Sequence, residues 1–509
     1  MEFLAHLLPA GIAVHAPVLI VAIPLILAPL AALMPNGRLA WGVSMIAAII
    51  VAVLALVLMG EVSISGSGVL SYHLGGWAPP LGIEYRVDAL NVPILLLVGL
   101  VGLLCTIYAL PSVADEIDAE KQPLFYSAFL VCLTGLLGVT ITGDAFNVFV
   151  FVEISSLSTY TLVAMGGGKD RRALTASYNY LILGTIGATF FVVGVGFLYM
   201  ATGTLNMADI ASVLAENGHN RVTQAAFAFI VVGLGLKAAM FPLHVWLPNA
   251  YAYAPNFVTA FLASTATKVA FYVLIRFVFS IFHPEVSFVA ISFTWVFAVL
   301  GTVGMIAASA QAIFQLDPRR VLAYSSVAQV GYMMLGLGMG TQAGLSAGLL
   351  HLMNHAMMKG ALFMALGAFA MKFGIRSIKS LNGLGQTMPV AASAFTIAGL
   401  SLVGVPLTIG FTSKWYLITA ALERGWWWAV AALILSSLLA LVYVGRMLAA
   451  IWTESPPNHR GKAVVRTPTP LTMLVPIGIL AAANIYFFFN ADPLVNLANA
   501  AAEAMMGGR

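Results

Sequence analysis

The stretch GLGLKAAMFPLHVWL, from Gly233 to Leu247, decides how this sequence folds. It is apolar enough to cross a membrane, yet it carries Lys237 in its middle and Pro242 five residues later. A lysine at bilayer depth costs about 2.5–3.5 kcal/mol on insertion scales, and a proline disfavours continuation of a helix. Freed backbone at that depth is tolerated only inside protein or around a cavity. The stretch therefore predicts a broken helix at a buried, hydrated ion site. A kinked helix whose lysine snorkels to the interface is the alternative.

The composition around this stretch is that of a polytopic membrane protein. Hydrophobic residues make up 61% of the 509 residues and charged residues only 8%, against about 25% charged in soluble domains. The two cysteines, Cys105 and Cys132, form no CxxC pair, and no phosphate-binding glycine loop is present. We therefore expect no redox cofactor, no bound metal and no nucleotide hydrolysis. The net charge of +4 is interpreted as loop charge and not as a nucleic-acid-binding surface.

Apolar runs recur along the whole chain. A spanning helix requires roughly 20 apolar residues, and on that rule the sequence predicts one transmembrane domain over residues 1–509 with about 14 spans. The expected fold is therefore all-α and polytopic. The predicted spans are Ala16–Met34, Leu39–Gly60, Ala89–Leu110, Leu124–Thr142, Ala145–Met165, Leu174–Met200, Ala225–Tyr251, Val258–Phe282, Phe288–Ala310, Val321–Met339, Ala343–Met371, Met388–Ala420, Trp426–Gly445 and Leu471–Phe488.

Basic residues divide unequally between alternate loops. One set of loops carries Arg38, Lys121, Lys169, Arg171, Arg172, Arg319, Arg320, Lys372, Arg376, Lys379, Arg446, Arg460, Lys462 and Arg466. The opposite loops and the C-terminus carry only Arg86, Arg221, Arg424 and Arg509. Because Lys and Arg favour cytoplasmic loops, this bias predicts that the first set lies in the cytoplasm. It also predicts both termini outside, an even number of spans, and a multi-pass location in a bacterial inner membrane.

A second interrupted span contains GVPLTIGFTSKW, with Pro406 at the break and Lys414 after it. Each break falls in the fourth helix of a five-helix set, which predicts two inverted repeats around a site near the bilayer midplane. The expected repeats cover residues 123–282 and 288–452, and each forms a half-channel. Two unrelated kinks are the alternative, because the repeats share no obvious residue identity.

Glu153 lies in the middle of the span FNVFVFVEISSLSTY and is the expected partner of Lys237. Burial alone favours a protonated carboxylate and a neutral amine, whereas a close pair keeps both charges. At ~4 Å and an effective dielectric constant of ~20, the attraction is roughly 4 kcal/mol. Separating the two groups would therefore push the lysine's proton onward. The pair is predicted to be a switch, and a static ion pair that fixes helix packing is the alternative.

Three more polar residues follow the first break. Lys268, in STATKVAFYVLIRF, has no acidic neighbour in the sequence, so its ammonium is expected to release its proton and to act as a relay. Snorkelling is again the alternative. His244 stands beside the break and is expected to pass protons between Lys237 and Lys268. Arg276 stays charged in proteins and is predicted to be structural or interfacial.

The eleventh span carries a polar stripe in HLMNHAMMKGALF. His351, His355 and Lys359 are spaced four residues apart, which places them on one helix face. Histidine titrates near neutral pH and has two ring nitrogens that accept and donate. The stripe therefore predicts a proton wire, which Lys414 ends near the outer side unless that lysine snorkels. HxxxH also fits zinc spacing, but no acidic third ligand lies nearby. A structural, hydrogen-bonded stripe is the remaining alternative.

In their order along the chain, these motifs resemble the antiporter-like proton-channel subunits. That superfamily includes three large membrane subunits of respiratory complex I, the membrane-bound hydrogenases, and the A-type and D-type subunits of the Mrp multisubunit sodium/proton antiporters. The similarity runs from roughly Gly75 to Ile451. It rests on Glu153, PLHVWLPNAY, TKVAFYVLIR, DPRRVLAYSSVAQ, HLMNHAMMKGALF and the second broken helix. The resemblance implies fourteen core helices, a Glu153–Lys237 pair, Lys268 as the bridge, and a second half-channel of His351, His355, Lys359 and Lys414.

Two segments favour one branch of that superfamily. GWAPPLGIEYRVDAL before the third span and ATGTLNMADIAS after the sixth are similar to the D-type subunit of the Mrp antiporters. The resemblance implies partner subunits of the Mrp A, B, C, E, F and G type, and exchange of protons for Na+ or another monovalent cation.

Two other functions stay open. The chain is alternatively a redox-driven proton-pumping subunit of a complex I-like NADH:quinone oxidoreductase or membrane-bound hydrogenase, with the electrons in partner subunits. A scaffold subunit with a vestigial channel is the third possibility, against which the cost of the buried charges argues. In each case the chain itself is expected to be a transport subunit and not an enzyme.

Overall fold

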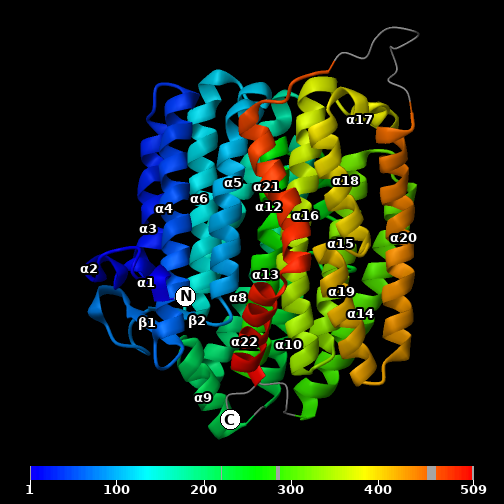
Figure 1. The fold of residues 1–509 in the computed structure, drawn as a ribbon. Coiled ribbons are helices and arrows are strands. Elements are labelled where there is room, and N and C mark those ends of the chain that lie inside the picture. Colours follow the sequence, from blue (N-terminus) through cyan, green and yellow to red (C-terminus); the bar gives the residue numbers. More distant parts are fainter. Residues whose placement is uncertain (1, 219, 283–286, 455–465, 507–509) are drawn as a thin grey trace.

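The structure, a computed structural model, describes residues 2–218, 220–282, 287–454 and 466–506. Within these residues the chain is a bundle of helices that run side by side (Figure 1). The described sheet is a small antiparallel hairpin of β1 (Val69–His73) and β2 (Glu84–Asp88), in which Val69 lies opposite Asp88. The bundle confirms the predicted all-α, polytopic fold.

The helices divide into those before and those after residue 286. The first group is α1 (Glu2–Ala5), α2 (Ala10–Ala13), α3 (Ala16–Ala32), α4 (Gly37–Ile64), η1 (Leu74–Gly76), α5 (Val92–Glu116), η2 (Ala119–Lys121), α6 (Gln122–Ile141), α7 (Ala145–Ala164), η3 (Met165–Gly168), α8 (Arg172–Thr202), α9 (Met207–Asn217), α10 (Arg221–Lys237), α11 (Leu247–Tyr253), α12 (Asn256–Ser264), α13 (Ala266–Ile275) and η4 (Arg276–Phe282). The second group is α14 (Ser287–Phe314), α15 (Pro318–Gly338), α16 (Gln342–Phe373), η5 (Ile378–Leu381), α17 (Leu384–Thr387), α18 (Pro389–Val403), α19 (Ile409–Glu423), α20 (Trp427–Trp452), α21 (Leu471–Phe489) and α22 (Asp492–Met506).

Each predicted span coincides with one helix or with helices separated by a break. Among the described residues, eleven helices are long and apolar enough to cross a membrane, and α3 and α18 are apolar but shorter. The two spans predicted to be broken, Ala225–Tyr251 and Met388–Ala420, are divided into α10 with α11 and into α18 with α19. Each break leaves two helices of 17 residues or fewer. They are therefore too short to be among the eleven spanning helices.

At the first break, the carbonyl groups that end α10 accept hydrogen bonds from residues that follow the helix. α10 stops at Lys237, and the backbone turns through Ala239, which has a positive φ of 56°. The last carbonyls of a helix have no partner within it. Here the Met240 amide donates to the Gly235 carbonyl at 2.8 Å, and the Trp246 indole donates to the Leu236 carbonyl at 2.9 Å. The break is therefore a stably capped end inside protein, as backbone at membrane depth requires.

The eighth span contains an interruption that the sequence prediction lacked. The predicted span Val258–Phe282 is confirmed as part of one apolar segment, Asn256–Phe282, but it is interrupted at Thr265, where φ is −122° and ψ is −58° between α12 and α13. The Thr265 hydroxyl donates to the Phe261 carbonyl at 2.7 Å, and such back-bonding competes with the helix ladder. No proline or glycine marks this position, so composition alone does not reveal the break.

Helix α16 runs through the centre of the bundle. It contacts α5, α12, α15, α18, α19, α21 and α22. Its burial is continuous from Gly344 to Phe369 except at Met357, which is partly exposed. A helix that is apolar all round is typically buried in this way. The polar stripe on α16 consequently lies inside the protein and away from the surrounding lipid.

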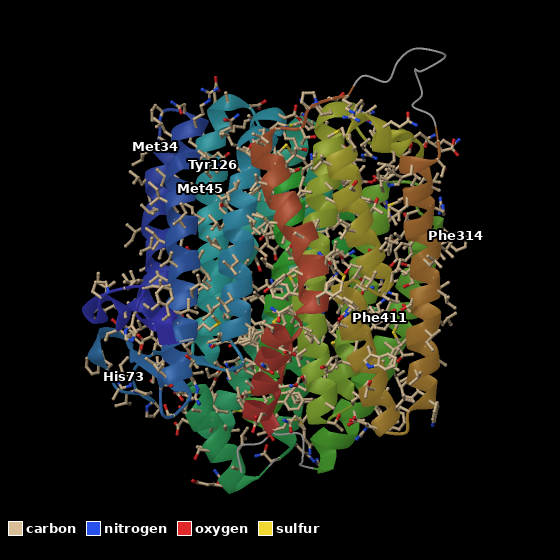
Figure 2. The ribbon with its side chains drawn as sticks, viewed as in Figure 1. Met34, Met45, His73, Tyr126, Phe314 and Phe411 are labelled. Carbon is tan, nitrogen blue, oxygen red and sulfur yellow. The ribbon has the colours of Figure 1, made fainter. Side chains whose placement is uncertain are left out.

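The loops alternate between the two ends of the bundle. The hairpin, α9 and α22 lie at one end, and α17 lies at the other (Figure 1). Met34 and His73 mark these two ends in Figure 2. Three basic residues used to predict the orientation, Arg460, Lys462 and Arg509, fall outside the described residues. The orientation and the inverted repeats over 123–282 and 288–452 stay predictions.

Candidate functional site

The first pair of charges forms where α7 meets the end of α10. The Lys237 ammonium lies 3.8 Å from a Glu153 carboxylate oxygen, with side chains 10% and 22% exposed. It also donates to the Ser156 hydroxyl at 2.7 Å and lies 3.4 Å from the Tyr160 hydroxyl. The shortest contact of the ammonium is therefore neutral, and the ion pair is the looser one. Lys237 is the last residue of α10, where the helix dipole favours a cation.

Lys268 lies at the interruption that the sequence prediction missed. Its side chain is fully buried, and its ammonium donates to the Ala263 carbonyl and lies 3.4 Å from the Thr267 hydroxyl. Ala263 belongs to the last turn of α12, whose carbonyls have no intrahelical partner. The break at Thr265 thus supplies the acceptor that this buried lysine needs. Snorkelling is excluded, because the side chain does not reach an interface.

Lys414 repeats this arrangement in the second half of the chain. From the start of α19 its ammonium donates back to the Leu402 and Val403 carbonyls at 3.1 and 2.9 Å, and to the Ser437 hydroxyl at 3.0 Å. Both carbonyls end α18, and the ammonium also lies 4.8 Å from the Tyr332 ring centre. The side chain is buried, so this lysine does not snorkel either. Lys268 and Lys414 are thus each held by carbonyls at the negative end of a helix, whereas the Lys237 ammonium contacts side chains of α7.

The predicted stripe on α16 is in place and is fully buried. The His351 ring bonds the Ser413 hydroxyl and the Gln329 amide oxygen, each at 2.9 Å. The His355 ring is parallel to it, with ring centres 6.3 Å apart, and has no protein hydrogen-bond partner among the described residues. Lys359 donates to the Leu322 carbonyl at 2.8 Å and to the Ser325 hydroxyl at 2.5 Å. Every group in the stripe can accept or give a proton.

Lys268 is held at the end of α12, which packs against α16. These two helices belong to opposite halves of the sequence. The bridge role of Lys268 between the halves stays a prediction.

His244 is placed differently from the prediction. Its ring stacks on Phe241 at 5.3 Å and meets Tyr324 of α15 edge-on at 6.4 Å. The described contacts bring it to neither Lys237 nor Lys268, so its relay role between them stays a prediction.

A cavity of about 830 Å³ opens around the end of α5 and the start of α12. Charged side chains line it, among them Asp115, Arg172 and Arg320. Glu116 also lines it and accepts from the backbone and side-chain amides of Asn256 at 2.7 and 2.9 Å. Asn256 begins α12, so Glu116 caps the N-terminus of the helix whose other end holds Lys268. The sequence analysis did not single out Glu116. The feature that could have indicated it is an acidic residue at the end of an apolar span.

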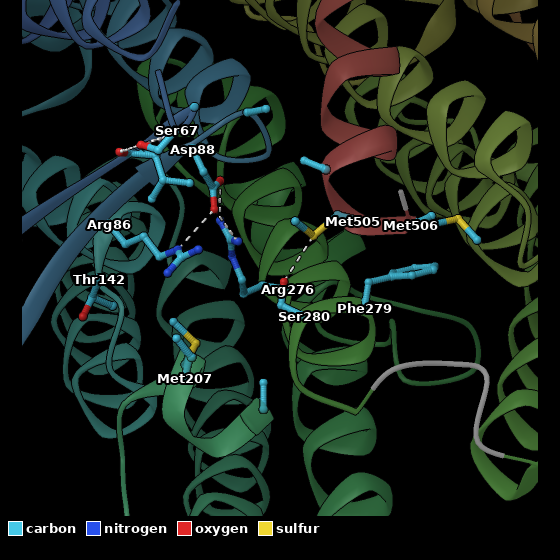
Figure 3. Close-up of a pocket in the computed structure, with 16 residues that line it drawn as sticks. Ser67, Arg86, Asp88, Thr142, Met207, Arg276, Phe279, Ser280, Met505 and Met506 are labelled. Carbon is cyan, nitrogen blue, oxygen red and sulfur yellow. Dashed lines mark hydrogen bonds and ion pairs between the residues drawn. The ribbon is translucent and has the colours of Figure 1, made fainter. Parts of the chain in front are cut away.

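A second cavity, of about 560 Å³, lies at the opposite end (Figure 3). Arg276 forms two bonds of 2.7 and 2.8 Å to the Asp88 carboxylate, and Arg86 lies 3.7 Å from it. Burial would raise the pKa of the Asp88 carboxyl, but Arg276 and then Arg86 outweigh burial and hold it below its usual value. This pair ties the hairpin to η4, in agreement with the structural role predicted for Arg276.

Together, the fold and the site define a membrane protein with a buried series of proton-accepting groups between two broken helices. Residues 142–440 match the family described as NADH:quinone oxidoreductase/Mrp antiporter, TM. The chain belongs to this family. The predicted superfamily is therefore confirmed, and the chain is one of its antiporter-like proton-channel subunits.

Relatives from two branches of the family resemble the chain over most of its length. NADH-quinone oxidoreductase subunit N of Desulforudis audaxviator is 41% identical over 495 residues, which cover 95% of this chain and 97% of that protein. The D-type subunit of the Na(+)/H(+) antiporter of Alkalihalophilus pseudofirmus is 32% identical over 446 residues, or 85% of each protein.

Solved structures agree with these relatives. A chain of the membrane-bound sulfane sulfur reductase, an archaeal respiratory membrane complex, superposes with a TM-score of 0.87 at 33% identity, covering 96% of this chain and 97% of that one. A chain of the Mrp complex from Dietzia sp. DQ12-45-1b also reaches 0.87, at 27% identity, covering 97% of each chain. These relatives and neighbours are subunits of multisubunit complexes, which confirms the prediction of partner subunits. The chain is a transporter-like subunit and not itself a catalytic enzyme.

Proposed function

We propose that this chain conducts protons within a multisubunit complex that exchanges them for Na+ or another monovalent cation. The observation that carries the proposal is the series of buried proton-accepting groups from Glu153 and Lys237 through Lys268 to the α16 stripe and Lys414. Buried ionisable groups in membranes are expensive and mark ion or proton routes. The antiporter branch is supported by the relative that is a D-type Na(+)/H(+) antiporter subunit and by the likeness to the Mrp complex.

The loose Glu153–Lys237 pair is the gate in this proposal. At the observed 3.8 Å, an effective dielectric constant of ~20 gives an attraction of roughly 4 kcal/mol. When Glu153 moves away, the ammonium keeps its neutral contact with Ser156 but loses this attraction, which favours release of its proton.

The released proton then moves toward Lys268. A cavity of about 40 Å³ reaches from Lys237 to Ala266 and Val269 of α13, which flank Lys268 in the sequence. A water molecule needs about 10–15 Å³ of such space and several polar partners. Ser156 and Thr159 also line the cavity and supply hydroxyls for that purpose. The cavity therefore supplies room and hydroxyl groups for the part of this step that lies between Lys237 and α13. The path of the exchanged cation is assigned to partner subunits.

The proposal is tested by Lys237→Ala and Glu153→Ala in the intact complex. Each variant removes one half of the gate, so we expect cation/proton exchange in membrane vesicles to fall below detection while all subunits still co-purify. Lys121→Ala is the matched control, because that lysine is exposed and pairs only with Asp118 of its own loop in the described structure. Full exchange by either gate variant contradicts the proposal.

A redox-driven proton pump is the second candidate. The 41% identical relative named NADH-quinone oxidoreductase subunit N favours it, and so does the likeness to the sulfane sulfur reductase complex. In that case the proton route is the same, and electron transfer in partner subunits drives it. Visible absorbance of the isolated complex separates the two candidates. Iron–sulfur or flavin bands favour the pump, and their absence favours the antiporter.

A further inference from the structure

Six hydroxyl groups outside the histidine stripe lie between Lys359 and Lys414. They come from three helices that pack together: α14, α15 and α20. Five of them are fully buried, and Ser437 is partly buried. We call this set the hydroxyl branch; its members are Ser309, Ser325, Tyr332, Ser436, Ser437 and Tyr443.

The branch begins at Lys359. The Lys359 ammonium donates to the Ser325 hydroxyl at 2.5 Å. The Tyr443 hydroxyl has no hydrogen bond within 3.5 Å among the described residues. Ser325 lies seven residues before Tyr332 on α15, and Tyr443 lies seven residues after Ser436 on α20, so each pair shares one helix face. A buried hydroxyl without a hydrogen bond is costly. Tyr443 is such a group, on the face of α20 from which Ser436 contacts α14.

The branch ends at Lys414. The Ser309 and Ser436 hydroxyls are 3.1 Å apart, and Ser436 directly precedes Ser437 on α20. Tyr332 lies 3.3 Å from the Ser437 hydroxyl. Lys414 donates to that same Ser437 hydroxyl at 3.0 Å. Hydrogen bonds therefore cover three parts of the branch, none of which uses a histidine: Lys359 with Ser325, Ser309 with Ser436, and Tyr332 with Ser437 and Lys414.

We propose that the hydroxyl branch is a second proton route between Lys359 and Lys414, parallel to the histidine stripe. The proposal rests on the proton conduction proposed above. A hydroxyl has one proton to donate and two lone pairs that accept. Each hydroxyl takes a proton at its oxygen and gives its own proton to the next group. The net change is one proton lost by the Lys359 ammonium and one gained by the Lys414 amine, with every hydroxyl neutral again.

Helix packing is the competing role for these groups. Ser325 also donates to the Leu322 carbonyl at 2.9 Å, and Ser436 donates to the Met305 carbonyl at 3.0 Å. Hydroxyls that bond across helices stabilise membrane bundles. Packing alone does not account for Tyr443, whose hydroxyl makes no bond within 3.5 Å in the described structure.

The test compares Tyr443→Phe in two backgrounds of the intact complex in proteoliposomes. One background is the natural chain, and the other carries His351→Gln with His355→Gln. Rates through parallel routes add, so we expect Tyr443→Phe to lower proton flux about twofold in the natural chain and about tenfold when the histidines are replaced. Tyr126→Phe is the matched control. This tyrosine is also buried, but it belongs to α6 on the opposite side of the bundle from α20 (Figure 2).

Three outcomes overturn the parallel route. They are an equal fold-loss in both backgrounds, no loss in either, and complete loss of flux from the histidine replacements alone. If Tyr443→Phe prevents assembly, Ser437→Ala is measured instead, because it removes the hydroxyl that links Tyr332 to Lys414. Failure of the branch leaves exchange still dependent on Lys237, whereas failure of the proposed function removes that dependence. The two failures are therefore distinguishable.

Discussion

At the scale of single residues, three lysines of the proposed route lie at the ends of interrupted helices. Lys268 and Lys414 each donate to carbonyls that end a helix, and Lys237 is itself the last residue of α10. Described salt bridges involve only Lys237 among these three. Helix ends carry partial charge and not a full carboxylate, so they hold an ammonium without neutralising it. Such a lysine is stabilised in place and still able to give up its proton.

Lys268→Arg tests whether proton release at the bridge matters. Arginine keeps a positive charge and stays protonated in proteins. We expect proton flux in reconstituted complex to fall about a hundredfold or more, because the bridge can no longer alternate between charged and neutral forms. Assembly, followed by co-purification of the subunits, should persist at a reduced level.

The matched control for that change is Lys121→Arg in an exposed loop. Flux close to that of the natural chain in Lys268→Arg would show that Lys268 supplies charge and not a proton. A variant that fails to assemble would be replaced by Lys268→Gln, which removes the titrating amine while keeping hydrogen-bond donors. Full flux in Lys268→Gln would likewise rule out the bridge.

At the scale of elements, the breaks position the ionisable groups. The second break turns through Gly404, with a φ of 89° that favours glycine. A Cβ at this position would meet the Lys414 side chain at 2.8 Å. The loop therefore fits closely around the lysine that ends the route, and its shape and the position of the ammonium are coupled.

Gly404→Ala tests that coupling. We expect left-handed backbone strain of about 1–2 kcal/mol together with a displaced Lys414, and so a several-fold loss of proton flux. Gly374→Ala is a close control, since Gly374 has a φ of 59° but open space around its Cβ position. The unfolding temperature should be lowered in both variants, whereas proton flux should be lowered only in Gly404→Ala. An equal loss of flux in both variants would contradict the coupling.

At the scale of the whole molecule, distant segments are joined by buried polar pairs. Asp88 of the hairpin binds Arg276, 188 residues later in the chain. Glu116 binds Asn256, 140 residues later. The first pair holds the hairpin on the bundle, and the second joins the cavity at the other end to α12. Both pairs involve the α12–η4 segment, which also carries Lys268.

Asp88→Asn should destabilise the chain in a pH-dependent manner. It leaves Arg276 buried without a counter-charge, which typically costs about 3–5 kcal/mol. The pKa of Asp88 is lowered in the folded chain, so its stabilisation is fully present above its unfolded pKa of about 3.9 and is lost as pH falls toward the folded value. The difference in unfolding temperature between the natural chain and Asp88→Asn should be constant near neutral pH and shrink below about pH 4.

The control for that measurement is Asp118→Asn, whose carboxylate is exposed. It should change the unfolding temperature little at any pH, because exposed pairs contribute only about 0–1 kcal/mol. A difference for Asp88→Asn that stays constant down to about pH 2 would show that ionisation of Asp88 is not what stabilises the hairpin.

The sequence by itself determined the spans, both predicted breaks, the candidate partners Glu153 and Lys237, and the spacing of the α16 stripe. These features are local, because hydropathy, proline and charge act within one helix or at its end. Only the tertiary structure decided the break at Thr265, the carbonyls that hold Lys268 and Lys414, and the capping of α12 by Glu116. It also decided that the Tyr443 hydroxyl is buried with no hydrogen bond among the described residues. Each of these depends on which helices pack side by side, and that arrangement is set by contacts between segments far apart in the sequence.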